Sequence, residues 1–98
     1  MMFGFGQAIE YLKVGKCLAR EGWNGKGMFV YKQPVAKIER SFIPDLTSMP
    51  ISAKSILIDK GIKSVTYTNQ MVIVNSERID NWVPSVSDIF AEDWVVVE

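Results

Sequence analysis

The chain has 98 residues, of which 48% are hydrophobic, and its 11 basic residues balance its 11 acidic residues. This length allows one small domain with a hydrophobic core. Proteins that bind DNA or RNA usually carry an excess of basic residues, so the balance disfavours a nucleic-acid polymer as partner. A small ligand with one or two phosphates needs only a few donors and remains compatible with this charge.

Missing residue types narrow the chemistry further. The chain has no histidine, which excludes the commonest general base, Ser-His and Cys-His nucleophile pairs, and zinc sites built from cysteine and histidine. The single cysteine, Cys17, fits a reducing compartment, and neither a signal peptide nor an apolar run of about 18 residues is present. We therefore expect a cytoplasmic protein that is not an enzyme, with no metal, no cofactor and no membrane contact.

The N-terminal region predicts an amphipathic helix over residues 6–14. Gly15 follows it, in the position where a helix commonly ends in a left-handed residue. The apolar residues recur at the spacing of one helical face, namely Phe5, Ala8, Ile9 and Leu12.

Two strands are predicted next. Residues 16–20 (KCLAR) alternate roughly, and residues 28–32 (MFVYK) are rich in β-forming residues. Pro34 is expected to end the second strand or keep it at a sheet edge. The stretch EGWNGKGM, from Glu21 to Met28, then connects the two strands.

The middle of the chain carries weaker signals. Residues 41–50 contain two prolines and predict an irregular loop, after which Ser52 is expected to cap a helix that runs to Lys60 and stops at Gly61. Strands are predicted over residues 63–68 and 71–74, around a turn at residues 68–70.

The C-terminal region begins with a predicted turn at residues 75–77 that leads toward Ile79 and Trp82. Ser85 and Asp88 have the spacing of a capping box, which predicts a short helix to about Glu92. Residues 94–97 then predict a closing strand. We expect a single α+β domain over residues 1–98, with an N-terminal amphipathic helix, an antiparallel sheet and a short C-terminal helix followed by that strand.

The glycine-rich connection raises a functional question. Three of the chain's seven glycines, Gly22, Gly25 and Gly27, lie within six residues. The stretch fits neither the Walker loop nor the dinucleotide fingerprint, because its glycine spacing differs from both and it leads into a strand. Asn24-Gly25 is a favoured hairpin turn, so a purely structural turn is the simpler interpretation. Trp23 has few local neighbours to bury it, which favours packing elsewhere, at an interface or against a ligand base.

A second candidate region surrounds the capped helix start. A helix N-terminus has free backbone N–H groups, and Ser85 and Ser87 add hydroxyls beside Trp82. The simpler interpretation places Trp82 in the core and leaves Ser85 and Asp88 to close the capping box. Glu92 and Asp93 are interpreted as a solvated helix end rather than a metal site, and Trp94 as part of a core strand.

Two long segments resemble the second family of Thoeris anti-defence proteins. They are FGQAIEYLKVGKCLAREGWNGKGMFV (Phe5–Val30) and WVPSVSDIFAEDW (Trp82–Trp94), together about two-fifths of the chain. The resemblance implies a small phage or prophage protein that acts in the host bacterial cytoplasm. It further implies a non-enzymatic sponge for cyclic ADP-ribose-type messengers, in particular glycocyclic ADP-ribose made by TIR-domain enzymes. The Thoeris effector would then stay inactive, and the family resemblance also implies a homotetramer with pockets at subunit boundaries.

The resemblance also implies a set of ligand-binding residues. Trp23 would stack on the ligand, Asn24 and Lys26 would make polar contacts, and the amides of two glycines would help. Asp88 is expected to cap its helix more than to touch ligand. The full predicted set is Trp23, Asn24, Gly25, Lys26, Gly27, Trp82, Ser85, Ser87 and Asp88.

The sequence departs from the family pattern in places, and two alternative functions remain. The stretch from about residue 33 to 70 differs from the pattern, as does Val86, and both bear on ligand choice more than on fold. One rival is a hydrolase of the same messenger that uses Asp88, Glu92 or Asp93. The other is a structural phage protein whose tryptophans mediate oligomerisation.

Overall fold

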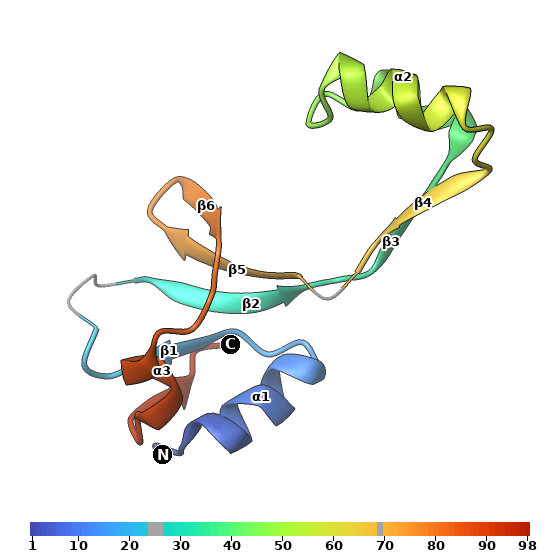
Figure 1. The fold of residues 1–98 in the computed structure, drawn as a ribbon. Coiled ribbons are helices and arrows are strands. Elements are labelled where there is room, and N and C mark those ends of the chain that lie inside the picture. The colour runs from blue at the N-terminus through green and yellow to red at the C-terminus, as the bar shows by residue number, and fades with distance from the viewer. Residues whose placement is uncertain (24–26, 69) are drawn as a thin grey trace. The chain divides into compact units, whose positions relative to one another are not determined.

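A computed structural model describes residues 1–23, 27–68 and 70–98 (Figure 1). The chain forms two compact units. The first comprises Met1–Gln33 with Asn69–Glu98, and the second comprises Pro34–Thr68. Within the described residues, no helix is long and apolar enough to cross a membrane.

The first unit contains a five-stranded sheet in the order β6-β5-β2-β1-β7. All four neighbouring pairs are antiparallel, with Leu18 opposite both Val30 of β2 and Val96 of β7. The strands are β1 (Leu18–Arg20), β2 (Phe29–Gln33), β5 (Gln70–Asn75), β6 (Arg78–Asn81) and β7 (Trp94–Val96).

Two helices accompany this sheet: α1 (Phe5–Lys13) and α3 (Val86–Phe90). α1 packs against β1, β2 and β7 and also contacts α3. Its apolar stripe is buried because Ala8 and Leu12 are the residues that face the sheet, as their spacing predicted. The core cluster consists of Ala8, Leu12, Leu18, Val30, Trp82 and Trp94.

The second unit is a two-stranded ribbon with two helices. β3 (Ala36–Glu39) pairs antiparallel with β4 (Ser64–Tyr67), and a 3-10 helix, η1 (Arg40–Asp45), precedes α2 (Ile51–Asp59). Side chains connect the helices, because the Lys54 amine donates to the Pro44 carbonyl at 2.9 Å and Arg40 donates to the Ile58 carbonyl at 3.1 Å.

Most predicted elements of the first unit are confirmed. α1 begins at Phe5 and ends at Lys13, and Gly15 has the left-handed φ of 92° expected after a helix. β1 and β2 are antiparallel neighbours connected by the glycine-rich stretch, and β2 ends just before Pro34. The α+β class is thereby confirmed. β6 was not predicted, because all four of its residues are exposed and show no alternation.

Several predictions for the middle of the chain were wrong. Residues 40–45 form a 3-10 helix rather than an irregular loop. The residue that caps α2 is Pro50, with no side-chain hydrogen bond, so Ser52 lies inside the helix and does not cap it. β4 and β5 belong to different sheets, and the turn predicted between them includes Asn69, which lies outside the described residues.

Candidate functional site

An ion-pair network surrounds Arg20, the last residue of β1. Because Arg20 lies opposite Trp94 in the β1–β7 ladder, its side chain reaches the residue that precedes β7. The Arg20 Nε donates to Asp93 Oδ1 at 2.9 Å, and Nη1 donates to Asp88 Oδ1 at 3.0 Å. One guanidinium thus connects β1, the start of β7 and α3.

The capping box at α3 is confirmed. The amide of Asp88 donates to Ser85 Oγ at 3.1 Å, and the amide of Ser85 donates to Asp88 Oδ2 at 2.9 Å. Asp88 is 8% exposed, and both of its carboxylate oxygens are hydrogen-bonded within the chain. This confirms its capping role, and the capping box leaves two fewer free amides for an anion at this five-residue helix.

The network holds both carboxylates ionised. Burial acts to raise the pKa of Asp88, but hydrogen bonds from Ser85 and Arg20 outweigh it, so the pKa lies below its usual value. The hydrogen bond from Arg20 is the main cause that lowers the pKa of Asp93. The hydrogen bond to Asp93 also raises the pKa of Arg20. All three groups stay charged at neutral pH.

Asp93 also fixes the start of the glycine-rich stretch. Its Oδ2 accepts from the Gly22 amide at 2.8 Å, and its backbone carbonyl accepts from the Glu21 amide at 2.9 Å. The Trp23 amide donates to the Arg20 carbonyl at 3.1 Å. The interpretation of Asp93 as part of a solvated helix end was therefore wrong. Its side chain is 27% exposed and bridges segments 71 residues apart.

The two tryptophans of the predicted site, Trp23 and Trp82, both contact a third tryptophan, Trp94. Trp23 contacts Trp94 edge-on, with ring centroids 5.4 Å apart, and Trp82 contacts it edge-on at 5.8 Å. Trp94 is fully buried, and its indole Nε1 donates to the Asp88 carbonyl at 3.0 Å. The fold thus brings the glycine-rich stretch and the C-terminal segment together, as a shared site requires.

The tryptophans differ in accessibility. Trp82 is 8% exposed and belongs to the core cluster, which is the simpler of its two sequence interpretations. Trp23 packs against the cluster but stays half-buried, so part of the residue remains accessible to a ligand. A ligand-binding role for Trp82 stays a prediction that relies on the small exposed part of its side chain.

An open pocket of about 390 Å³ lies beside Trp82. The Trp82 amide donates to the Met71 carbonyl, which continues the β5–β6 pairing to this point. The side-chain amides of Gln70 and Asn81 add donors and acceptors to the lining, a role that no sequence motif indicated. The lining residues are Gln70, Met71, Asn81, Trp82 and Val83.

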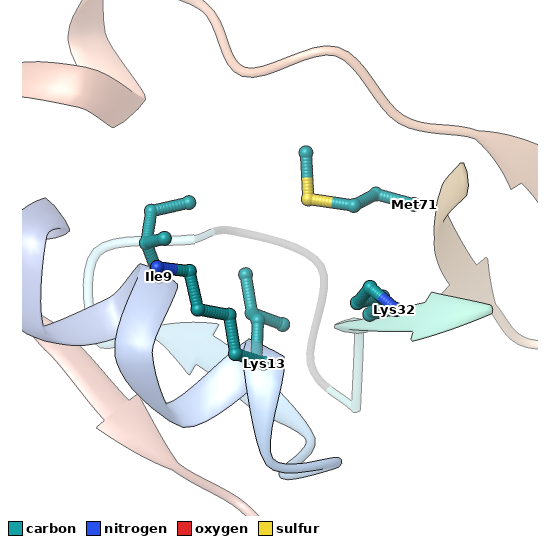
Figure 2. Close-up of a pocket in the computed structure, with 5 residues that line it drawn as sticks. Ile9, Lys13, Lys32 and Met71 are labelled. Carbon is teal, nitrogen blue, oxygen red and sulfur yellow. The ribbon is translucent and has the colours of Figure 1, made fainter. Parts of the chain in front are cut away.

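A smaller pocket of about 180 Å³ lies between α1 and the sheet (Figure 2). Figure 2 shows Ile9 and Lys13 of α1 on one side of it and Met71 and Lys32 on the other, and Leu12 completes the lining. The Lys13 amine is paired with Glu10 at 3.0 Å on the exposed helix surface. None of the predicted site residues that the structure describes lines this pocket.

The remaining predicted residues are less constrained. Gly27 is exposed with a φ of 84°, a left-handed conformation that favours glycine, and Ser87 is exposed on α3. Asn24, Gly25 and Lys26 lie outside the described residues, so their ligand contacts stay predictions. Within the described part of the chain, no three acidic or cysteine residues gather as a metal site.

Comparisons with known proteins agree with the resemblance of the two segments. The family model of the Thoeris anti-defense 2-like domain matches residues 3–97. The chain is also similar to Thoeris anti-defense 2 of Bacillus phage SP01, with 33% identity over 100 residues that cover 95% of this chain and 92% of the phage protein. The match includes the central region that departs from the two-segment pattern. The chain therefore belongs to the Thoeris anti-defense 2-like family.

Proposed function

We propose that this protein binds and sequesters a cyclic ADP-ribose-type messenger, specifically a glycocyclic ADP-ribose isomer made by a TIR-domain enzyme. Sequestration keeps the messenger from the Thoeris effector and so protects a phage in the host cytoplasm. Membership of the anti-defense family, over residues 3–97, is the observation that carries the anti-Thoeris role. The convergence of the two predicted half-sites on Trp94 supports a small-ligand mechanism.

Trp23 is the residue that we assign to base stacking. It is the half-buried member of the tryptophan cluster, and its ring packs edge-on against Trp94 at an interplanar angle of 79°. A stacked base on such a ring contributes about 1–3 kcal/mol in nucleic-acid complexes. A ring that packs against a buried neighbour loses less side-chain entropy on binding than a fully exposed ring, so more of that energy contributes to affinity.

The charges of the residues around the site indicate which part of the ligand each residue would bind. Arg20 faces two carboxylates, so the three groups sum to a net charge of −1, from one positive and two negative charges. That cluster disfavours a pyrophosphate. We therefore assign the pyrophosphate to Lys26 and to backbone amides of the glycine-rich stretch, among them Gly27. The ribose hydroxyls and the exocyclic amine of adenine suit the Asn24 side chain and the hydroxyls of Ser85 and Ser87.

The site is suited to retention rather than hydrolysis. A general acid must hold a proton near neutral pH, whereas the environments of Asp88 and Asp93 lower their pKa values. Both carboxylates already accept hydrogen bonds within the chain. We propose that the messenger is released chemically unchanged when the protein unfolds.

The protein is further proposed to act as a homotetramer with ligand pockets at subunit boundaries. Nanomolar retention requires about 12 kcal/mol, which favours a site enclosed on several sides. The pocket beside Trp82 is open in the single chain. Val83, Val86 and Phe90, next to or within α3, are 84%, 72% and 78% exposed, an apolar surface that subunit contact would cover. Sedimentation equilibrium tests the tetramer, and a monomer at micromolar concentration would refute it.

Isothermal titration calorimetry tests the ligand. We expect the wild-type protein to bind glycocyclic ADP-ribose, and Trp23→Ala to bind it about 5- to 150-fold more weakly, the equivalent of one lost stacking contact. Phe29→Ala is the matched control, because Phe29 is also half-buried but contacts Tyr31 outside the tryptophan cluster. Both variants should keep the wild-type oligomeric state. The proposal fails if the wild type binds no cyclic ADP-ribose isomer, or if only the assembly depends on Trp23.

A further inference from the structure

The Arg20–Asp93 pair was absent from the predicted site, yet it adjoins the glycine-rich stretch. Asp93 uses Oδ1 for the Arg20 Nε and Oδ2 for the Gly22 amide, at 2.9 and 2.8 Å. One carboxylate thus connects the side chain at the end of β1 with the backbone two residues later. We name this arrangement of Arg20, Gly22 and Asp93 the carboxylate clamp.

We propose that the carboxylate clamp positions Trp23 for the ligand, with Arg20 and Asp93 as positioning residues that do not contact it. This inference rests on the proposed function, because it concerns the same site. The backbone that leads into Trp23 is held at two consecutive amides: the Gly22 amide donates to Asp93 in the clamp, and the Trp23 amide donates to the Arg20 carbonyl at 3.1 Å. Trp23 is therefore oriented before any ligand arrives.

Arg20 determines the direction of the Asp93 carboxylate. The guanidinium also bonds Asp88, whose second oxygen is committed to the capping box of α3. The planar, fork-like donor geometry of arginine allows two carboxylates to be fixed at once, which lysine cannot reproduce. The clamp is therefore anchored in α3 and β1, two elements of the same unit, rather than in the segment that it holds.

A substitution at Gly22 tests the clamp, because an added side-chain carbon would lie against the Asp93 carboxylate. A Cβ placed on Gly22 would lie 2.9 Å from Asp93 Oδ2, and among the described residues it would meet no other atom within 4 Å. Gly22→Ala therefore displaces the carboxylate without removing any charged group. If Asp93 is truncated first, the same methyl group no longer meets the only contact that the described residues offer it. The two substitutions must then be strongly non-additive.

A double-mutant cycle on ligand affinity tests the proposal. Gly22→Ala and Asp93→Ala should each weaken glycocyclic ADP-ribose binding about tenfold in calorimetry, because the ligand must then order Trp23 itself. The double variant should bind no more weakly than Asp93→Ala alone. Gly6→Ala is the control, since a Cβ on Gly6 meets no atom of the described residues within 4 Å, and this variant should keep wild-type affinity. All titrations are made at a temperature where circular dichroism shows each variant folded.

Three further measurements distinguish positioning from general stability. The Gly22 amide resonance should move with pH as Asp93 protonates, and this titration should vanish in Asp93→Asn. That variant keeps an oxygen acceptor for Gly22 but loses the ion pair, so its affinity should lie between those of wild type and Asp93→Ala. Phe29→Ala, which lies outside the clamp, should keep wild-type affinity even where it lowers the unfolding midpoint.

The outcomes distinguish the inference from the proposed function. A wild type that binds, with clamp variants that bind equally well, overturns the inference and leaves the function intact. Additive losses in the double variant also overturn it, because they show independent defects. A wild type that binds no cyclic ADP-ribose isomer overturns the function, and the positioning role falls with it.

Discussion

Trp94 donates a hydrogen bond to the Asp88 carbonyl. We therefore predict that Trp94→Phe lowers the unfolding free energy more than Trp82→Phe does. Trp94 and Trp82 both belong to the core, lie edge-on to each other and are 0% and 8% exposed. Within the described residues, only Trp94 uses its indole N–H in a hydrogen bond, at 3.0 Å. Substitution of either by phenylalanine removes comparable volume, so the difference between the two variants isolates that bond.

The expected magnitudes follow from the two contributions. Loss of the larger ring should cost each variant about 1–2 kcal/mol in unfolding free energy. Trp94→Phe should lose about 1 kcal/mol more for the hydrogen bond. The Asp88 carbonyl keeps a longer bond from the Ala91 amide at 3.4 Å, which limits the additional penalty. The difference corresponds to about 4–8 °C in the unfolding midpoint for a domain of this size.

Urea denaturation followed by far-UV circular dichroism measures both costs. The experiment is repeated at several protein concentrations, because subunit association would make the apparent stability depend on concentration. Equal losses for Trp94→Phe and Trp82→Phe would refute the assigned hydrogen bond. A larger loss for Trp82→Phe would show that Trp82, rather than Trp94, is the centre of the cluster.

Two other predictions concern the same region. Because the native pKa values of Asp88 and Asp93 lie below the ordinary 3.8, their contribution to stability is complete above that pH and is lost as pH falls through the lowered values. These groups should therefore leave the urea midpoint unchanged between pH 7 and 5, and the midpoint should fall below about pH 4. In Arg20→Met this acid-induced fall of the midpoint should be smaller than in the wild type. A fall of equal size would contradict the ion-pair assignment. Ser85→Ala should cost about 1 kcal/mol through loss of the capping box, whereas exposed Ser87→Ala should cost almost nothing, and thermal denaturation of the two variants side by side checks this.

Local patterns predicted the local structure well. The apolar spacing of α1 is a property of nine consecutive residues, and the capping box of α3 involves two residues three positions apart. Such features depend little on the remainder of the chain. β6 was missed because its four residues are all exposed and show no alternation of apolar and polar side chains. β3 (AKIE) does alternate, but it is only four residues long and three of them are exposed.

Only part of the candidate site could be predicted from the sequence, because its other contacts join residues far apart in the chain. Trp23 and the capping residues stand out as residue types in unusual positions, and the family resemblance connects them. The ion pair between Arg20 and Asp93 joins residues 73 positions apart, and nothing in either local sequence marks it. It exists because β1 and β7 become neighbours in the sheet, which is a property of the topology. Gln70 and Asn81 likewise meet in one pocket only through the fold.

Recovery of the intact messenger after capture tests the sponge mechanism most directly. The protein is incubated with excess glycocyclic ADP-ribose, freed of unbound nucleotide by gel filtration and then denatured, and the released nucleotide is identified by chromatography. The account predicts a stoichiometric amount of unchanged messenger that again activates the Thoeris effector. Cleaved product in excess of the protein would show a hydrolase, and an empty protein would show that no messenger is held.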